Sequence, residues 1–192
     1  MDNPNQHYCL PGIKDKTVVV TGGSKGLGKA ISLQMASMGS KVAIIDVDES
    51  SSLKLVEESE KIEGTIQFYK GDISKKNEMD NCMEAIYTDF NSFDILINNA
   101  GITYPIPFEK ITMDDWEKII NINLTGTFIC SQIAAKYFLR QGKGNMVMVS
   151  SGSALTGSGG SLCYAASKGG INSMVRGLSR ELASEGIRVN GV

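Results

Sequence analysis

The chain has 192 residues, of which 42% are hydrophobic and 21% charged, a composition typical of one globular domain with a substantial core. Its 19 basic and 21 acidic residues give a net charge of −2 and are scattered, which argues against a nucleic-acid or membrane-surface protein. No apolar run reaches the roughly 18–20 residues of a membrane span and Met1–Gln6 lacks signal-peptide order, so we expect a cytoplasmic location.

Short β-branched runs alternate with longer segments of helical period. The predicted strands are Thr17–Thr21, Lys41–Asp46, Thr65–Lys70, Asp94–Ile97, Asn145–Ser150 and Ile187–Val192. The predicted helices are Gly26–Met38, Glu49–Lys61, Lys75–Phe90, Met113–Arg140 and Leu162–Ser184, with N-caps at Ser74 and Thr112 and C-terminal glycines at Gly39 and Gly186. This order predicts an α/β fold: a Rossmann-type, doubly wound parallel sheet with helices on both faces, in three α/β/α layers. Residues 17–192 would form this single domain after an N-terminal tail, residues 1–16.

Histidine and cysteine usage excludes several kinds of catalytic site. The only histidine, His7, lies in the polar tail, so Ser-His-Asp catalysis and multi-histidine metal sites are not expected. The cysteines are too dispersed for a CxxC motif or a disulfide framework: Cys9, Cys82, Cys130 and Cys163. We therefore predict no metal site and assign acid–base chemistry to Tyr, Lys, Asp, Glu or Ser side chains.

The first predicted strand runs into a glycine-rich turn, Thr21–Gly28, that leads directly into a helix. Glycines let the backbone approach a ligand closely, and the helix N-terminus offers unpaired N–H groups to a diphosphate. A P-loop is excluded because Ala30 stands where that motif needs a Ser or Thr for magnesium. Asp46 ends the second strand 18 residues after Gly28, at a spacing that suits a carboxylate on the adenosine ribose. The turn is therefore predicted to bind a dinucleotide.

Tyr164 and Lys168 lie four residues apart in a predicted helix, so their side chains share one face. A cation beside a phenol favours the ionised form and makes the phenol a usable acid–base group. The spacing alone is weak support for function, because the same pair also occurs on solvated helix faces.

These motifs together resemble the short-chain dehydrogenase/reductase family over nearly all of the predicted domain. The glycine turn matches the family pattern TGxxxGxG, and Asn98–Gly101 matches its NNAG motif. Asn123 matches the family's helix asparagine, and Tyr164 with Lys168 matches its YxxxK motif. Ser151 lies thirteen residues before Tyr164, where the family has its catalytic serine.

The resemblance implies an oxidoreductase that transfers hydride between a nicotinamide cofactor and a ketone or secondary alcohol. Tyr164 would be the general acid/base on the substrate oxygen, and Ser151 would hydrogen-bond that oxygen. Lys168 would favour the phenolate and hold the nicotinamide ribose, while Asn123 would hold a water that links Lys168 to solvent. The residues implied in cofactor binding are Gly22, Ser24, Lys25, Gly26, Leu27, Gly28, Asp46, Asp72, Ile73, Asn99, Ala100, Gly101, Tyr164 and Lys168. An ordinary turn aspartate stays the alternative for Asp72.

Two signals conflict over the cofactor. Asp46 would repel the 2′-phosphate of NADP, whereas Lys25 lies where many NADP-using members of the family carry a basic residue. A carboxylate beside a dianion must be desolvated, while a lysine can swing into water, so NAD is favoured over NADP.

The family domain is usually longer, and we expect this chain to lack the last strand and the segment that closes over the nicotinamide and substrate. Three interpretations stay open: a dehydrogenase for a sugar, polyol or steroid-type alcohol, an NADP-dependent 3-oxoacyl-thioester (acyl-carrier-protein) reductase, and a nucleotide-binding but inactive fragment. The predicted helices 113–140 and 162–184 are expected to pair with their symmetry mates in a homodimer or homotetramer.

Overall fold

The computed structural model describes residues 12–192, so His7, Cys9 and most of the predicted tail lie outside the described residues. Six strands form one sheet in the order β3-β2-β1-β4-β5-β6, and every neighbouring pair is parallel. The strands are β1 Thr17–Thr21, β2 Lys41–Asp46, β3 Thr65–Lys70, β4 Ile95–Asn98, β5 Gly144–Met148 and β6 Ile187–Gly191. The strand order reverses between β1 and β4, and a crevice at the carboxyl ends is expected there.

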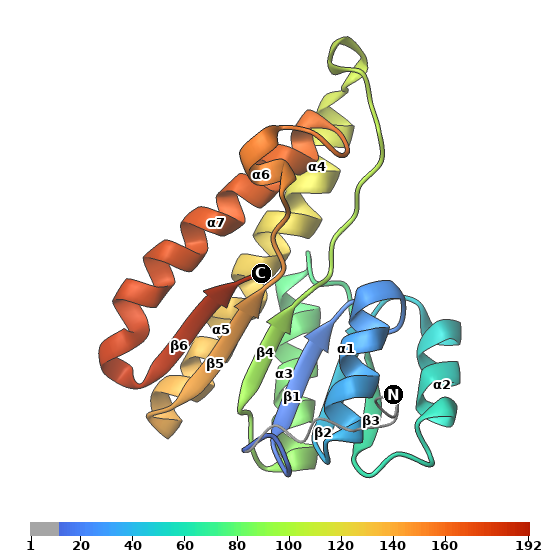
Figure 1. The fold of residues 1–192 in the computed structure, drawn as a ribbon, viewed down its shortest axis with the longest axis vertical. Helices are drawn as coiled ribbons and strands as arrows, with labels where there is room; N and C mark the ends of the chain where they lie inside the picture. Colours follow the sequence, from blue (N-terminus) through green and yellow to red (C-terminus); the bar gives the residue numbers. More distant parts are fainter. Residues whose placement is uncertain (1–11) are drawn as a thin grey trace, which may run out of the picture.

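Helices cover both faces of the sheet (Figure 1). One face carries α1 Gly26–Ser37 and α2 Glu49–Glu58, and the other carries α3 Lys76–Phe90, α5 Thr127–Gln141 and α7 Leu162–Leu182. The shorter elements are η1 Phe108–Lys110, α4 Met113–Ile120, η2 Asn121–Gly126, α6 Ser153–Thr156 and η3 Ala183–Glu185. The predicted three-layer, doubly wound architecture is confirmed. Within residues 12–192, every helix is too short or too polar to cross a bilayer.

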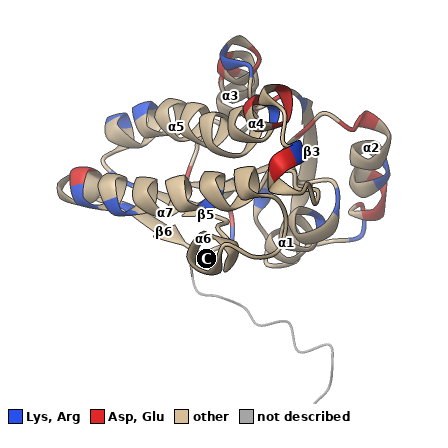
Figure 2. Ribbon diagram, turned by 90° about the horizontal axis from the view of Figure 1, so that it is seen from above, with Lys and Arg blue, Asp and Glu red and all other residues tan. Residues whose placement is uncertain are grey.

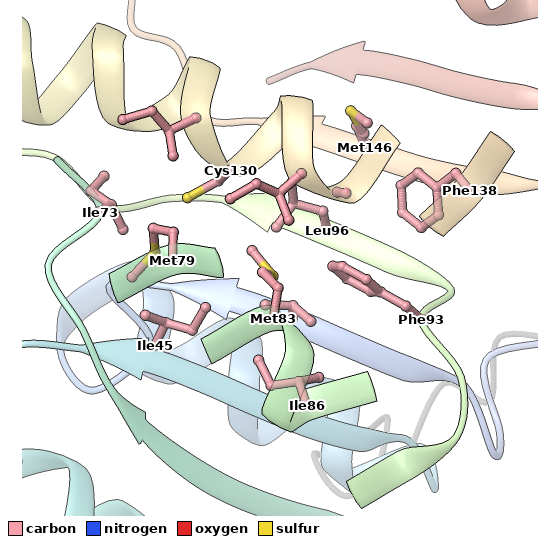
Figure 3. Packing of buried hydrophobic residues seen from close by; sticks show 14 of the residues in the cluster. Ile45, Ile73, Met79, Met83, Ile86, Phe93, Leu96, Cys130, Phe138 and Met146 are labelled. Carbon is pink, nitrogen blue, oxygen red and sulfur yellow. The ribbon is translucent and has the colours of Figure 1, made fainter. Parts of the chain in front are cut away.

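Apolar side chains fill the space on both sides of the sheet. In β1, Val19 belongs to one buried cluster, while Val18 and Val20 belong to the other, because successive strand residues point to opposite faces. All of β1 is buried, and the three valines at its centre fit a strand that is covered on both faces. Figure 3 shows Met83 of α3 and Phe138 of α5 meeting the sheet, and each such burial stabilises the fold by roughly 1.5–3 kcal/mol. The cysteines within residues 12–192 are buried and free of disulfide bonds: Cys82, Cys130 and Cys163.

Helix ends agree with prediction at three of the four marked positions. Thr112 caps α4 in a capping box with Asp115. Gly39, which follows the C-cap of α1, and Gly186, the C-cap of η3, both have positive φ. The prediction that Ser74 caps α3 is wrong, because Lys75 is the N-cap. The backbone N–H and hydroxyl of Ser74 instead both donate to Asp72 Oδ1, at 3.0 and 2.7 Å.

The segment predicted as one helix, 113–140, consists of α4, the π-helical turn η2 and α5. The short elements η1 and α6 were not expected from the sequence, and β5 ends at Met148 rather than at Ser150. The turn into α6 forms because Ser151 Oγ accepts the backbone N–H of Ser153 at 3.1 Å.

Candidate active site

A cavity of about 610 Å³ lies at the carboxyl ends of β1 to β4, where the strand order reverses. Its walls come from the end of β2, the loops after these four strands, the first turn of α1 and η2. Every residue predicted to bind the cofactor lines this cavity except Tyr164 and Lys168. The lining residues that sequence reasoning missed are Ile45, Val47, Asp48, Gly71, Ile102 and Ile122.

The glycine turn after β1 is held tightly against the loop after β4. A β-carbon on Gly28 would lie 2.0 Å from the carbonyl oxygen of Gly22, so only glycine fits there. Asn99 Nδ2 donates to the carbonyls of Thr21 and Gly22, both at 3.0 Å. Thr21 Oγ1 accepts the N–H groups of Asn99 and Ala100, both at 3.1 Å. Asn99 therefore positions the turn with its side chain.

The N-terminus of α1 is suited to an anion. Its N-cap, Lys25, makes no side-chain capping bond, and the first turn of α1 contains no acidic residue. The unpaired N–H groups and the positive end of the helix dipole therefore face the cavity without an internal anion. This end fits the diphosphate of a dinucleotide.

Two carboxylates close the cavity beyond β2. Asp46 Oδ2 accepts the N–H and the hydroxyl of Ser24 at 3.1 and 2.6 Å, and Asp46 Oδ1 accepts the N–H of Asp48 at 3.0 Å. Asp48 forms an ion pair with Lys25. The hydrogen bond and charge of Asp48 raise the pKa of Lys25, and Lys25 in turn holds the pKa of Asp48 far below its ordinary value.

Asp72 and Ile73 form the wall after β3. Asp72 lines the cavity while its Oδ1 holds the turn through Ser74, so the turn role and a ligand contact are compatible. Ile73 packs so closely on η2 that a β-carbon at Gly126 would lie 2.7 Å from its side chain. The cavity wall and η2 are thereby joined.

Asn123, in η2, ties the loop after β4 to α7. It is fully buried, and its Oδ1 accepts the N–H of Ile102 at 2.8 Å while its Nδ2 donates to the carbonyl of Ile102 at 2.9 Å. The same Nδ2 donates to Ser167 Oγ at 3.1 Å. π-Helical turns are rare and frequent at functional sites, and here the turn carries the asparagine predicted from the sequence.

Tyr164 and Lys168 lie on α7, directly beyond the cavity. Lys168 is only 4% exposed, and its Nζ donates to the carbonyl of Val149 at 2.7 Å and lies 5.6 Å from the ring centre of Tyr164. Burial lowers the pKa of Lys168 to about 8. A β-carbon on Gly101 would lie 3.7 Å from Lys168 Nζ, so this cavity-lining glycine separates the cavity from the ammonium by one contact.

Ser151 lies in the turn before α6, which packs against α7. Its hydroxyl donates to Ser153 Oγ at 3.1 Å, and within the described residues the side-chain hydrogen bonds of Ser151 are with Ser153. The neighbouring Ser150 is turned toward α7, with its hydroxyl 2.6 Å from Asn172 Oδ1.

Ser167 lies between Tyr164 and Lys168 in α7 and was not among the site residues predicted from the sequence. It is fully buried, accepts from Asn123 and donates to the carbonyl of Tyr164 at 2.7 Å. A small polar residue between Tyr164 and Lys168 was the available signal. Neither helical spacing nor composition could have shown that Asn123 is its partner.

Comparison with known proteins shows the family of the chain. The family model for short chain dehydrogenases matches residues 16–192. The 3-oxoacyl-(acyl-carrier-protein) reductase FabG of Thermotoga maritima is 33% identical over 180 residues, which are 94% of this chain and 73% of that protein. The crystal structure of NAD+-bound xylitol dehydrogenase has a TM-score of 0.90 at 25% identity and covers 94% of this chain and 70% of its own. The crystal structure of gox2181 also has a TM-score of 0.90, at 30% identity, and the match covers 93% of this chain and 70% of gox2181. The chain belongs to the short-chain dehydrogenase/reductase family of oxidoreductases, which use a nicotinamide cofactor.

Proposed function

We propose that this protein interconverts a secondary alcohol and a ketone, with Tyr164 as the general acid/base. The observation that carries the proposal is that Gly101, which lines the cavity at the carboxyl ends of β1 to β4, lies against both Asn123 and Lys168. A nicotinamide bound in the cavity would supply or accept the hydride. The residues of the chain would then have to manage the proton on the substrate oxygen.

The side chains near that oxygen divide this work. Tyr164 donates its hydroxyl proton to the oxygen during reduction and accepts the alcohol proton during oxidation. Ser151 donates a hydrogen bond to the same oxygen, exchanging its present bond to Ser153. Lys168, as a buried cation 5.6 Å from the phenol ring centre, stabilises the phenolate. Because its pKa is lowered to about 8, Lys168 can also exchange a proton near neutral pH.

NAD is the proposed cofactor, with NADP as the alternative. Asp46 lines the cavity, and its carboxylate is fixed by Ser24, so it would accept hydrogen bonds from a ribose and repel a 2′-phosphate. Lys25, the residue that favours NADP, is engaged by Asp48. The charges around this end of the cavity therefore favour NAD.

The substrate is proposed to be a small alcohol or ketone rather than a carrier-bound thioester. Residues 150–163 contain no charged residue, and α6 is uncharged in Figure 2. On the other flank, η1 and α4 together carry more acidic than basic residues: Glu109, Asp114, Asp115 and Glu117 against Lys110 and Lys118. An anionic phosphopantetheine arm would be better served by a basic surface. The similarity to a 3-oxoacyl-(acyl-carrier-protein) reductase keeps that substrate class as the second candidate.

Turnover can be tested by following the absorbance of reduced nicotinamide with a panel of small ketones, secondary alcohols and 3-oxoacyl thioesters. We expect Ser151→Ala to lower kcat by about 10²–10³-fold, because one donor to the reacting oxygen is lost. Ser158→Ala is the matched control, since Ser158 is an exposed serine just after α6 whose hydroxyl is hydrogen-bonded to Thr156, and it should stay within about twofold.

The outcomes of this assay separate the three interpretations. Equal turnover by the Ser151→Ala and Ser158→Ala variants would remove Ser151 from the mechanism. Dinucleotide binding without turnover of any panel member would support the inactive, nucleotide-binding interpretation. If the chain neither binds a dinucleotide nor turns over any panel member, the proposed function is refuted.

We also propose that residues 17–192 act as one domain that assembles into a homodimer or homotetramer through α4, α5 and α7. Large apolar side chains are exposed on α4 and α5: Trp116, Phe128 and Leu139. Phe128, 49% exposed, should become buried on assembly, so Phe128→Glu is expected to shift the mass measured by light scattering toward the monomer. A monomeric mass for the unmodified chain would contradict the proposed assembly.

A further inference from the structure

We propose that Asp48 is a second residue that determines cofactor specificity: it disfavours a 2′-phosphate by its own charge and by neutralising Lys25. The inference rests on the proposed dinucleotide site and goes beyond it, since Asp46 was the only carboxylate that the sequence motif marked for this role. Lys25, Asp46 and Asp48 all line the same cavity.

The arrangement keeps the carboxylate in place and leaves the ammonium dependent on it. Asp48 is the N-cap of α2, where its Oδ1 accepts the N–H of Ser51 and the hydroxyl of Ser50, both at 3.0 Å. Its Oδ2 pairs with Lys25, and its own N–H donates to Asp46 Oδ1 at 3.0 Å. The two carboxylates are therefore fixed relative to each other by the backbone between them.

The charge count at this end of the cavity is unfavourable for a phosphate. Lys25 supplies one positive charge against the two negative charges of Asp46 and Asp48. The neighbouring lysines of α1 and β3 are also engaged by carboxylates: Lys29 with Glu58 at 2.6 Å and Lys70 with Glu49 at 2.7 Å. A 2′-phosphate would thus add negative charge to a surface whose nearest cation is already balanced.

The size of the effect is limited by exposure. The side chain of Lys25 is 67% exposed and that of Asp48 30% exposed, and ion pairs in such positions are weak. We therefore expect removal of the Asp48 charge to change the preference by about tenfold rather than to reverse it completely, and the change should shrink with added salt.

Binding of ADP-ribose and of 2′-phospho-ADP-ribose, measured by calorimetry, tests the inference without any turnover. Asp48→Asn removes the charge but keeps the α2 cap, because asparagine caps helices as well as aspartate does. The ratio of the two Kd values should move about tenfold toward the 2′-phosphate ligand. Asp46→Ala, a reference variant, should move the ratio in the same direction.

Glu49→Gln is the matched control. It removes the same charge from the adjacent residue, but Glu49 pairs with Lys70 and does not line the cavity. We expect the ratio of Kd values to change by less than about twofold.

The role of Lys25 is separated by a double-mutant cycle. In the unmodified chain Lys25→Met should change the ratio little, whereas in the Asp48→Asn background it should remove the part of the gain that comes from the released Lys25. An unchanged ratio in Asp48→Asn overturns the inference, as does a Lys25→Met effect of equal size in both backgrounds. If neither ligand binds the unmodified chain, the proposed dinucleotide site fails and the inference with it. If both ligands bind but the ratio of their Kd values is the same in Asp48→Asn as in the unmodified chain, only the inference fails.

Discussion

Tyr164→Phe is expected to lower kcat/KM by about 10²–10⁴-fold, the usual contribution of a positioned acid–base group, while ADP-ribose binding changes little. The substitution removes only the hydroxyl. The backbone of Tyr164 stays tied to α7, because its carbonyl accepts from Ser167 Oγ at 2.7 Å and its N–H lies 3.4 Å from Ser161 Oγ. The cavity also remains intact, since Tyr164 does not line it.

The measurement compares initial rates of nicotinamide oxidation or reduction with the affinity for ADP-ribose. Tyr87→Phe is the matched control, because Tyr87 lies on α3, is 38% exposed and stacks on Tyr137, with ring centres 5.0 Å apart. Turnover by Tyr164→Phe equal to that of Tyr87→Phe would eliminate the proposed proton transfer. Loss of ADP-ribose binding along with turnover would instead indicate a wider structural change.

The sheet was predictable from sequence where the local signal and the packing agree. β1, β2 and β3 were predicted at their observed bounds, because each is a run rich in β-branched residues that is bounded by turn residues. The π-helical turn η2 was not predictable, since a helix of continuous apolar period conceals an extra residue in one turn. Ser74 was assigned as a cap for its residue type, but its hydroxyl and its N–H both donate to Asp72 Oδ1.

The residues of the cavity were largely predictable, because glycines and carboxylates at the ends of successive strands can be recognised in the sequence. Such glycines indicate close approach of the backbone, and such carboxylates indicate a ribose-binding position. What escaped prediction are pairings between elements far apart in the chain. Asn123 with Ser167, and Lys25 with Asp48, become partners only when the helices are packed. The Val149 carbonyl that receives Lys168 carries no sequence signal at all. The sequence therefore indicated which residues lie at or near the cavity, and the tertiary structure showed the hydrogen-bond or ion-pair partner of each.

The second large effect expected is on stability. The free energy of unfolding of the unmodified chain should rise relative to that of Lys168→Met by about 2–3 kcal/mol between pH 7 and pH 10. Burial lowers the pKa of Lys168 from 10.5 to about 8 in the folded protein. At pH 7 the ammonium is charged in both states, so folding bears its full desolvation. Between about pH 8 and pH 10.5 the unfolded chain keeps a proton that the folded protein has lost, so the folded state gains stability as pH rises.

Denaturant unfolding of both proteins at several pH values would measure this difference, and the titration of other groups cancels because both chains share them. Lys110→Met is the control, since Lys110 is exposed on η1 and loses little hydration on folding, so its curve should run parallel to that of the unmodified chain.

The hydrogen bond from Lys168 to the Val149 carbonyl offsets part of the desolvation, and Lys168→Met leaves that carbonyl without its donor. The loss of this hydrogen bond shifts the unfolding free energy of Lys168→Met by a nearly constant amount at every pH. It therefore adds no pH dependence to the difference between the two proteins. Parallel curves for Lys168→Met and the unmodified chain would show that Lys168 keeps an ordinary proton affinity. A lysine of that kind would still supply charge to Tyr164, but it would not lose its own proton to solvent near neutral pH.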